Sequence, residues 1–219
     1  MTTNALPTAE WLRDTVGVNF EKDNVFQFGG HSRKRALIPE GHTGTEVITK
    51  FSALADKMGI PVITNMKAEE LVKDKDGRVV AVKAISGGKE YTFNAKGGVV
   101  LATGGFGANK GMLSGNLKNA LYYGVKSSNG EGHQMAMKIG AKTQMMDLGK
   151  IYPNGMEVAP GIAKSTIWSN KAAFEDNAGI MVNKAGKRVI SELDTNHNIK
   201  NEEVKQGGKL FILMDEPSY

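Results

Sequence analysis

The chain has 219 residues, of which 40% are hydrophobic and 23% are charged, so it can bury a sizeable core and wholesale disorder is excluded. Its net charge of +5 is spread along the chain, and the absence of cysteine excludes disulfides, thiolate metal sites and a thiol nucleophile. No apolar run approaches the ~20 residues that span a bilayer, and no signal peptide is expected. These observations leave the compartment open, with the cytoplasm as the default.

The first third of the chain predicts two helices and a glycine-led loop. Thr8 is expected to cap a short first helix that ends near Gly17. Residues 29–35 form a loop that begins with two glycines and continues with polar and basic side chains. Apolar residues then recur at helical spacing over residues 43–58, which predicts the strongest helix of the chain.

The middle of the chain predicts strands. One strand is expected over residues 60–64, and an antiparallel meander is expected over residues 68–93. Residues 99–102 form a continuous apolar run, typical of a buried strand in a parallel sheet. The small residues 103–105 follow at once, and they let a ligand approach the backbone N–H groups beyond the end of that strand. Taken alone, this stretch is also compatible with an ordinary strand-to-loop turn.

The last part of the chain has weaker patterns. The expected elements are a partly helical stretch over residues 109–123, a helix over 132–141, irregular chain over 145–168, a hairpin of 179–183 with 188–190, and a strand over 210–214. The change to irregular chain near Asp147 places a predicted domain boundary between residues 146 and 147.

Two further features of the sequence bear on nucleic-acid and metal binding. The basic run at residues 33–35 has no interleaved aromatic residues, so nucleic-acid binding is a third and weaker hypothesis. The four histidines lack metal-ligand spacing, so we expect no metal site.

Six segments, taken in their order and spacing, resemble the flavoprotein subunits of the fumarate reductase and succinate dehydrogenase superfamily. The resemblance is strongest to flavocytochrome-type fumarate reductases and their urocanate- and ketosteroid-reducing relatives. The segments are residues 29–35, the helix that begins at Thr43, and residues 65–72, 100–106, 129–133 and 180–188. The resemblance implies an α/β fold, α+β in its second part. Residues 1–146 would be a partial, Rossmann-like FAD-binding domain with an antiparallel meander, and residues 147–219 part of a capping domain.

The resemblance also implies FAD as the cofactor and hydride transfer from the flavin to an activated alkene of a small-molecule substrate. It places Gly29, Gly30, His31 and Ser32 near the isoalloxazine, Thr103, Gly104 and Gly105 along the adenosine, and Glu69 at the adenine edge. It implies neither a nucleic-acid partner nor a membrane span.

The chain departs from the family pattern at the expected catalytic positions. Tyr152 stands where the family has a substrate-binding histidine, and Asn196 stands where it has a proton-donating arginine. Ala172 and Glu175 stand about where the family has an acid and arginine relay. An amide cannot replace a guanidinium as proton donor or carboxylate clamp, so we assign no catalytic residue and do not expect fumarate reduction. His197 is a candidate replacement acid, or simply an exposed histidine.

The first hypothesis is therefore an internal fragment of an FAD-dependent oxidoreductase that is inactive by itself. No G-x-G-x-x-G turn occurs in the sequence, so we expect FAD binding by this chain alone to be weak or absent. The alternative is a folded, non-catalytic structural or interaction module that binds no flavin. Because the family's first and last strands are not encoded, we also expect exposed strand edges and a homo-oligomer that covers them.

Overall fold

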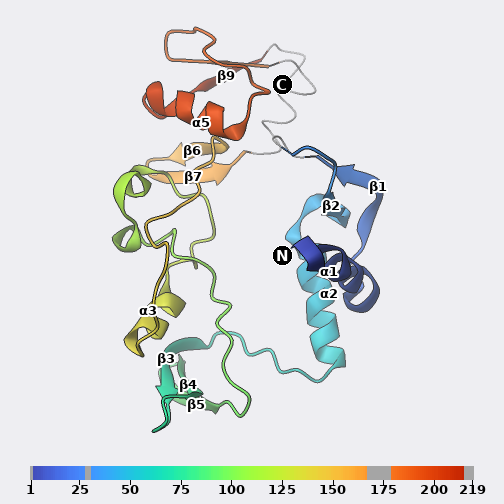
Figure 1. Cartoon of the computed structure of the whole chain (residues 1–219), viewed down its shortest axis with the longest axis vertical. Coiled ribbons are helices and arrows are strands. Elements are labelled where there is room, and N and C mark those ends of the chain that lie inside the picture. Colours follow the sequence, from blue (N-terminus) through green and yellow to red (C-terminus); the bar gives the residue numbers. More distant parts are fainter. Residues whose placement is uncertain (1, 28–30, 167–178, 215–219) are drawn as a thin grey trace. The chain divides into compact units, whose positions relative to one another are not determined.

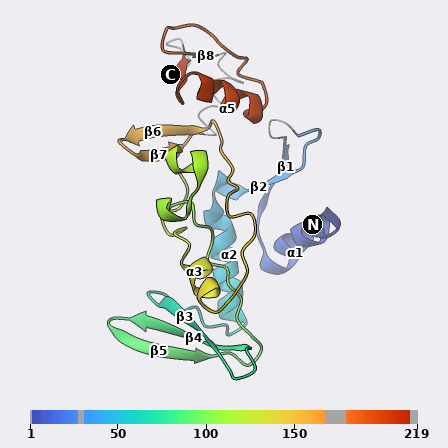
Figure 2. The same cartoon turned by 60° about the vertical axis from the view of Figure 1, so that its left-hand side comes forward.

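The computed structural model describes residues 2–27, 31–166 and 179–214. The chain divides into two compact units, Met1–Thr64 and Asn65–Tyr219 (Figure 1). Within the described residues, every paired strand is antiparallel, and the strands form small sheets of two or three members (Figure 2). The predicted combination of helices with an antiparallel meander is therefore present.

The first unit opens with helix α1 (Ala5–Trp11), which continues as a π-type segment over Leu12–Val16. Gly17 ends this segment with a φ of 81°, as predicted, because glycine adopts left-handed backbone without strain. The prediction that Thr8 caps the helix is wrong. Its hydroxyl donates a 2.7 Å hydrogen bond to the carbonyl of Asn4, one turn back within the helix. The helix begins earlier because a proline is tolerated in a first turn.

A hairpin follows α1 in the first unit. Strands β1 (Phe20–Phe26) and β2 (Ala36–Pro39) pair antiparallel with an irregularity in register. Ile38 on β2 and Val18 just before β1 are buried and supply part of the small core of the unit. The loop with the basic run lies between the two strands.

Helix α2 (Gly44–Lys57) confirms the strongest helix prediction of the sequence. Thr43 caps it, since its hydroxyl oxygen accepts a 3.3 Å hydrogen bond from the N–H of Thr45. The aromatic rings of Phe51 on α2 and Trp11 on α1 are in contact, with centroids 5.7 Å apart. Aromatic packing thus joins the two helices of this unit.

The second unit begins with the predicted meander. Strands β3 (Lys67–Lys73), β4 (Val79–Ser86) and β5 (Lys89–Asn94) form one sheet in the order β3-β4-β5. The turn-forming sequences between the strands fix this local topology. The buried side chains of the sheet come from β3 and β4, and they are Leu71, Ala81 and Ala84.

Two strands predicted from continuous apolar runs are absent. Residues 60–64 in the first unit and residues 99–102 in the second have no ladder partner among the described residues. Their side chains are exposed, except for the half-buried Val99, and the exposed fraction reaches 68% for Val62 and 90% for Val100. A wholly apolar strand is buried only when other strands flank it and layers cover both faces, and the described residues provide neither. The sequence pattern indicates that a segment is hydrophobic, but it does not indicate whether other strands lie beside that segment.

Helix α3 (Glu131–Lys138) forms near the predicted position, with Met135 buried and Gly140 in left-handed conformation beyond its end. The stretch before it, predicted to be partly helical, contains only 3-10 turns at Lys110–Met112 and Gly115–Asn119. Helix α3 packs against the first strand of the meander sheet.

The prediction of irregular chain over residues 145–168 is wrong in part. Strands β6 (Gly155–Ala159) and β7 (Ile162–Ser165) form a hairpin there. Pro160 and Gly161 make its two-residue turn, with Gly161 at a φ of 75°. Prolines and glycines indicate irregular chain, but a Pro-Gly pair between short apolar stretches also marks a turn.

The predicted hairpin of residues 179–183 with 188–190 is reduced to one bridge between Val182 and Arg188. Strand β8 (Ile180–Val182) pairs instead with β9 (Phe211–Leu213), which confirms the last predicted strand but with a distant partner. Local turn signals favour a short hairpin, whereas hydrogen bonding to a remote strand has no local signal.

Helix α5 (Asn196–Lys205) was not predicted. It buries only Ile199, so the sequence shows no apolar face of helical period.

The domain boundary predicted between residues 146 and 147 stays a prediction. In the part of the chain that the structure describes, no helix has the length and apolar character needed to cross a membrane.

Candidate functional site

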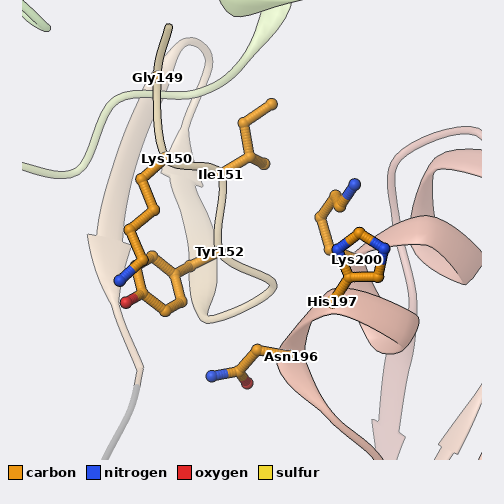
Figure 3. A pocket seen from close by; sticks show the side chains of 7 residues that line it. All are labelled: Gly149, Lys150, Ile151, Tyr152, Asn196, His197 and Lys200. Carbon is orange, nitrogen blue, oxygen red and sulfur yellow. The ribbon is translucent and has the colours of Figure 1, made fainter.

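A pocket of about 340 Å³ lies within the second unit, between residues 149–152 and the first turns of α5 (Figure 3). A volume of this size can hold a small organic molecule. The pocket brings together Tyr152 and Asn196, which depart from the family pattern, and His197, the candidate replacement acid. Its lining residues are Gly149, Lys150, Ile151, Tyr152, Asn196, His197 and Lys200.

The start of α5 is held by a network of hydrogen bonds. The hydroxyl oxygen of Thr195 accepts from the N–H of Asn198 at 3.3 Å. The carboxylate of Asp194 accepts from the side-chain amide of Asn198 at 2.7 Å and from the N–H of Thr195 at 2.6 Å. These bonds, chiefly the one from Asn198, lower the pKa of Asp194 below its usual value. With Ile199 buried beneath the helix, this network fixes the backbone that carries Asn196, His197 and Lys200.

The facing wall is the extended segment of residues 149–152, in which the side chains of Lys150 and Tyr152 contact each other. The ammonium nitrogen of Lys150 lies 4.4 Å from the centroid of the Tyr152 ring, which is a cation–π contact (Figure 3). Gly149 lies so close to Leu117 that a Cβ there would be 2.6 Å from its Cδ1 atom. Burial raises the pKa of the neighbouring Tyr123, and the nearby Tyr152 adds to that effect. The segment is therefore seated against the 117–123 region.

The predicted adenosine-side residues form a second cluster, around the start of α3. The ammonium nitrogen of Lys67 lies 3.4 Å from a carboxylate oxygen of Glu69 and 3.6 Å from one of Glu131. The hydrogen bond to Glu69 is the main reason that the pKa of Lys67 is raised. This ion pair places Glu69, on β3, beside the first turn of α3.

The loop of residues 103–105 meets the same end of α3. Gly132 lies so close to Thr103 that a Cβ there would be 1.9 Å from its hydroxyl oxygen. Gly104 has a left-handed φ of 73°, and the carbonyl of Gly105 accepts a 3.1 Å hydrogen bond from the N–H of Gly130. Thr103 and Gly105 thus contact the start of α3, and Glu69 is linked to it through Lys67.

Two observations test whether FAD fits this cluster. The loop residues 103–105 are exposed, and no atom lies within 4 Å of the position that a Cβ on Gly105 would take. His133 packs edge-on against the Phe106 ring, with centroids 5.3 Å apart, and its buried Nδ1 atom has no hydrogen-bond partner among the described residues. An open backbone beside a carboxylate and an unused ring nitrogen is compatible with the adenosine part of the cofactor.

The other predicted flavin-binding residues belong to the first unit. Gly29 and Gly30 lie outside the described residues. His31 and Ser32 are exposed, and the hydroxyl of Ser32 accepts a 3.0 Å hydrogen bond from the guanidinium of Arg35. Their role near the isoalloxazine stays a prediction.

Other predicted positions add nothing to either cluster. Ala172 and Glu175 lie outside the described residues. Among the described residues, no group of three or more histidine, aspartate or glutamate side chains could hold a metal ion.

Sequence reasoning missed four residues of the pocket lining, which are Gly149, Lys150, Ile151 and Lys200. Lys200 follows His197 by three positions, a spacing that places both side chains on one face of a helix. This spacing indicates a shared face only if the segment is helical, and the sequence does not predict α5. Lys150 has no local signal, because it lies in the segment of residues 145–168 that the sequence predicts to be irregular.

Comparison with known proteins identifies the class of this chain. The family model described as an FAD binding domain matches residues 1–210, so the chain belongs to that family of flavin-binding oxidoreductases. The family prediction, with FAD as its cofactor, is confirmed.

Among the similar proteins is a urocanate reductase of Eggerthella lenta, 36% identical over 88% of this chain and 32% of that protein. A probable fumarate reductase, Ifc3, of Shewanella frigidimarina is 31% identical over 96% of this chain and 35% of its own length. The chain thus spans about a third of the length of these relatives.

Solved structures show the same fold. The open conformation of a flavocytochrome c3 fumarate reductase matches 99% of this chain and 38% of its own, with a TM-score of 0.78 and 28% identity. A 3-ketosteroid-Δ4-(5α)-dehydrogenase of Rhodococcus jostii matches 99% of this chain and 49% of its own, with a TM-score of 0.69 and 25% identity. The predicted fold class, part of a fumarate reductase-type flavoprotein, is confirmed.

Proposed function

We propose that this chain supplies part of the FAD site and the substrate pocket of a reductase that passes a hydride from reduced flavin to an activated alkene. One observation carries the proposal. Tyr152 and Asn196, matched by resemblance to the family's substrate-binding histidine and proton-donating arginine, lie 44 positions apart yet line one pocket. Family membership supports the assignment of that pocket to the substrate.

The residues proposed to hold FAD act through hydrogen bonds and close approach. The carboxylate of Glu69 accepts hydrogen bonds at the adenine edge, and the exposed 103–105 backbone lies along the adenosine. Gly29, Gly30, His31 and Ser32 contact the isoalloxazine side. When bound, FAD supplies the hydride that reduces the alkene.

The pocket residues define what the substrate can be. The phenol of Tyr152 and the amide of Asn196 donate hydrogen bonds to the substrate, but an amide does not release a proton at neutral pH. Neither side chain forms the two-point contact that a guanidinium makes with a carboxylate. We therefore propose an acceptor other than fumarate, with His197 as the candidate acid.

The test is an anaerobic assay of the enzyme encoded by the complete coding region, with reduced viologen as electron donor. Fumarate, acrylate and an aryl-substituted acrylate serve as acceptors. Viologen oxidation with an alkene other than fumarate is expected. A flavin-loaded enzyme that reduces none of these alkenes, or that prefers fumarate, contradicts the proposal.

For the 219-residue chain alone we propose weak or absent FAD binding and no turnover, because its sequence contains no G-x-G-x-x-G turn to hold the pyrophosphate. Isothermal titration with FAD measures this. Tight binding would reveal a phosphate site in the residues of this chain.

We also propose that the chain self-associates through its exposed apolar runs. Val62 and Val100 are the most exposed members of two runs that have no strand partner among the described residues. Unpaired backbone N–H and C=O groups are a template for pairing with another chain, and exposed apolar side chains favour association.

A further inference from the structure

The two walls of the pocket belong to different stretches of the second unit. Residues 149–152 form one wall, and the first turns of α5 form the other (Figure 3). Lys150 contacts Tyr152 on its own segment, and Lys200 donates to the side chain of Asn201 on its own helix. Within the described part of the chain, no hydrogen bond or ion pair joins lining residues of opposite walls. A polar contact that holds the walls together must therefore lie outside the lining.

Glu157 and Lys209 form such a contact. The Nζ atom of Lys209 lies 2.8 Å from Oε2 of Glu157, although the two residues are 52 positions apart. Glu157 belongs to β6, which begins just after the wall of residues 149–152. Lys209 lies just beyond the end of α5. The ion pair thus joins the chain that leaves one wall to the chain that leaves the other.

The carboxylate of Glu157 is held in place from a second side. Its Oε1 atom accepts a 3.0 Å hydrogen bond from the N–H of Gly161 in the β6–β7 turn, which leaves Oε2 for Lys209. The hydrogen bond from Lys209 is the main reason that the pKa of Glu157 is lowered, and the N–H of Gly161 adds to the effect. A carboxylate that is already fixed loses less conformational freedom when it pairs with a lysine.

Glu157 is connected to its wall through tight backbone packing. A Cβ on Gly155 of β6 would lie 2.9 Å from Cδ1 of Tyr123, and a Cβ on Gly149 in the wall would lie 2.6 Å from Cδ1 of Leu117. The wall and β6 therefore rest against the same stretch of chain. Because neither glycine has space to shift inward, the position of Glu157 follows that of the wall.

Lys209 is connected to α5 in a comparable way. The N–H of Gly208 donates a 2.8 Å hydrogen bond to the carbonyl of Glu203 on the last turn of the helix. The side-chain amide of Gln206 donates to the carboxylate of Glu202, also at 2.8 Å. These bonds keep the chain between the helix end and Lys209 against α5. A change in the separation of Lys209 from its partner carboxylate therefore changes the separation of the two walls.

We propose that Glu157 and Lys209 are positioning residues that hold the two walls of the pocket together from outside, so that breaking their ion pair widens the pocket and weakens binding in it. That the occupant of the pocket is the substrate rests on the proposed function, whereas the spacing of the walls does not. An exposed ion pair is screened by salt and is weak. The pair therefore restrains the walls without locking them.

The test measures the separation of the walls directly. The chain contains no cysteine, so Lys164→Cys on β7 and Val204→Cys on α5, both at exposed positions, give two unique sites for spin labels. Double electron–electron resonance of the labelled 219-residue chain gives their distance distribution. Glu157→Gln removes the charge but keeps an oxygen that accepts from Gly161. This variant and Lys209→Gln should each increase the population at longer distances by about 1.5- to fivefold.

Three controls separate loss of the ion pair from general damage. Lys209→Arg keeps the cation and should give the wild-type distribution. The double variant Glu157→Gln/Lys209→Gln should be no more open than either single variant, because both changes remove one interaction, whereas independent structural effects would add. Lys83→Gln, which breaks a 2.9 Å ion pair with Glu70 in the meander sheet, is the matched control and should change nothing. Circular dichroism melting of each labelled variant shows that it is folded.

The outcomes that overturn the proposal are unchanged distributions in both single variants, additive effects in the double variant, or a Lys209→Arg chain that behaves like Lys209→Gln. In the complete enzyme, Lys209→Gln should raise KM for the alkene by the same factor and leave kcat unchanged. The distance measurement does not depend on turnover. Distances that respond to these variants, combined with a complete enzyme that reduces no alkene, would retain this inference and reject the proposed function instead.

Discussion

Arg188 and Glu192 form a two-point ion pair within the second unit. The Nη2 atom of Arg188 lies 2.6 Å from Oε2 of Glu192, and its Nε atom donates to Oε1 at 3.1 Å. Oε1 also accepts a 2.7 Å hydrogen bond from the N–H of Met181 on β8. The carboxylate thus ties β8 to the segment that leads into α5, and it helps to set the position of the pocket wall.

Replacing Glu192 with alanine should destabilise the second unit. The side chain of Glu192 is only 6% exposed, so its removal leaves the buried Met181 N–H without an acceptor. Leaving a buried donor unsatisfied costs about 1–3 kcal/mol, and we expect a loss of unfolding free energy of that order. Urea unfolding measures it. Lys205→Ala, which removes an exposed ion pair on α5, is the control and should leave the midpoint unchanged.

The same contact predicts a pH dependence of stability. Burial raises the pKa of Glu192, but the hydrogen bonds from Arg188 and Met181 outweigh it and hold the pKa below its usual value. A carboxyl with a lowered folded-state pKa contributes stability above its unfolded pKa of about 4.3, and that stability is lost as the pH falls through the folded pKa. The stability difference between the wild-type chain and Glu192→Gln should therefore shrink below about pH 4.3. A difference that stays constant down to pH 3 would show that the charge of Glu192 is not involved.

The contact between Gly132 and Thr103 gives a third prediction. A Cβ on Gly132 would lie 1.9 Å from the Thr103 hydroxyl oxygen and 2.8 Å from its Cβ atom, so Gly132→Ala must displace the loop from α3. Overpacking of this kind costs about 1–3 kcal/mol. Gly105→Ala, with no atom within 4 Å of the new Cβ, is the matched control and should be neutral in thermal unfolding. Equal melting temperatures for the two variants would contradict this packing.

Local sequence signals predicted the local parts of this fold. The meander followed from turn residues between alternating strands, and α2 followed from apolar residues that recur at helical spacing. The pairing of β8 with β9 depends on residues about thirty positions apart, and no local pattern reports it. The prediction of a buried strand at residues 99–102 was wrong for a related reason, because burial of a strand requires neighbouring strands that are distant in the sequence.

The candidate site was predicted in part. Tyr152, Asn196 and His197 were found by comparison with a family pattern, and the structure brings all three to one pocket. Lys200 could not be found in that way, since its only signal is a three-residue spacing from His197 on a helix with a single buried apolar residue. The roles of Glu69 and residues 103–105 at the adenosine stay predictions, and the position of both near the start of α3 had no signal in the sequence.

Self-association gives a fourth prediction. Val100 is 90% exposed within an apolar run that lacks a strand partner among the described residues. Light scattering at increasing concentration should therefore give a mass above that of one chain, and Val100→Lys should lower it. Leu193→Lys, at an isolated position that is 72% exposed, is the control and should leave the mass unchanged. A clean monomer at high concentration would reject the prediction.

The last prediction concerns fumarate. Reduction of this dicarboxylate requires a flavin at near-attack distance, a clamp on the carboxylate and an acid for the adjacent carbon. By resemblance, Tyr152 and Asn196 occupy the positions of the clamp and the acid, and neither side chain is suited to that role. Each positioned acid or base contributes about a hundredfold to ten-thousandfold.

Restoring one group is therefore not enough, and both the unmodified chain and Asn196→Arg should be silent in a steady-state assay with fumarate and reduced viologen. The restored guanidinium could donate a proton, but Tyr152 would still leave the second carboxylate without its cationic partner. An active unmodified chain would show that the matched catalytic positions are wrong.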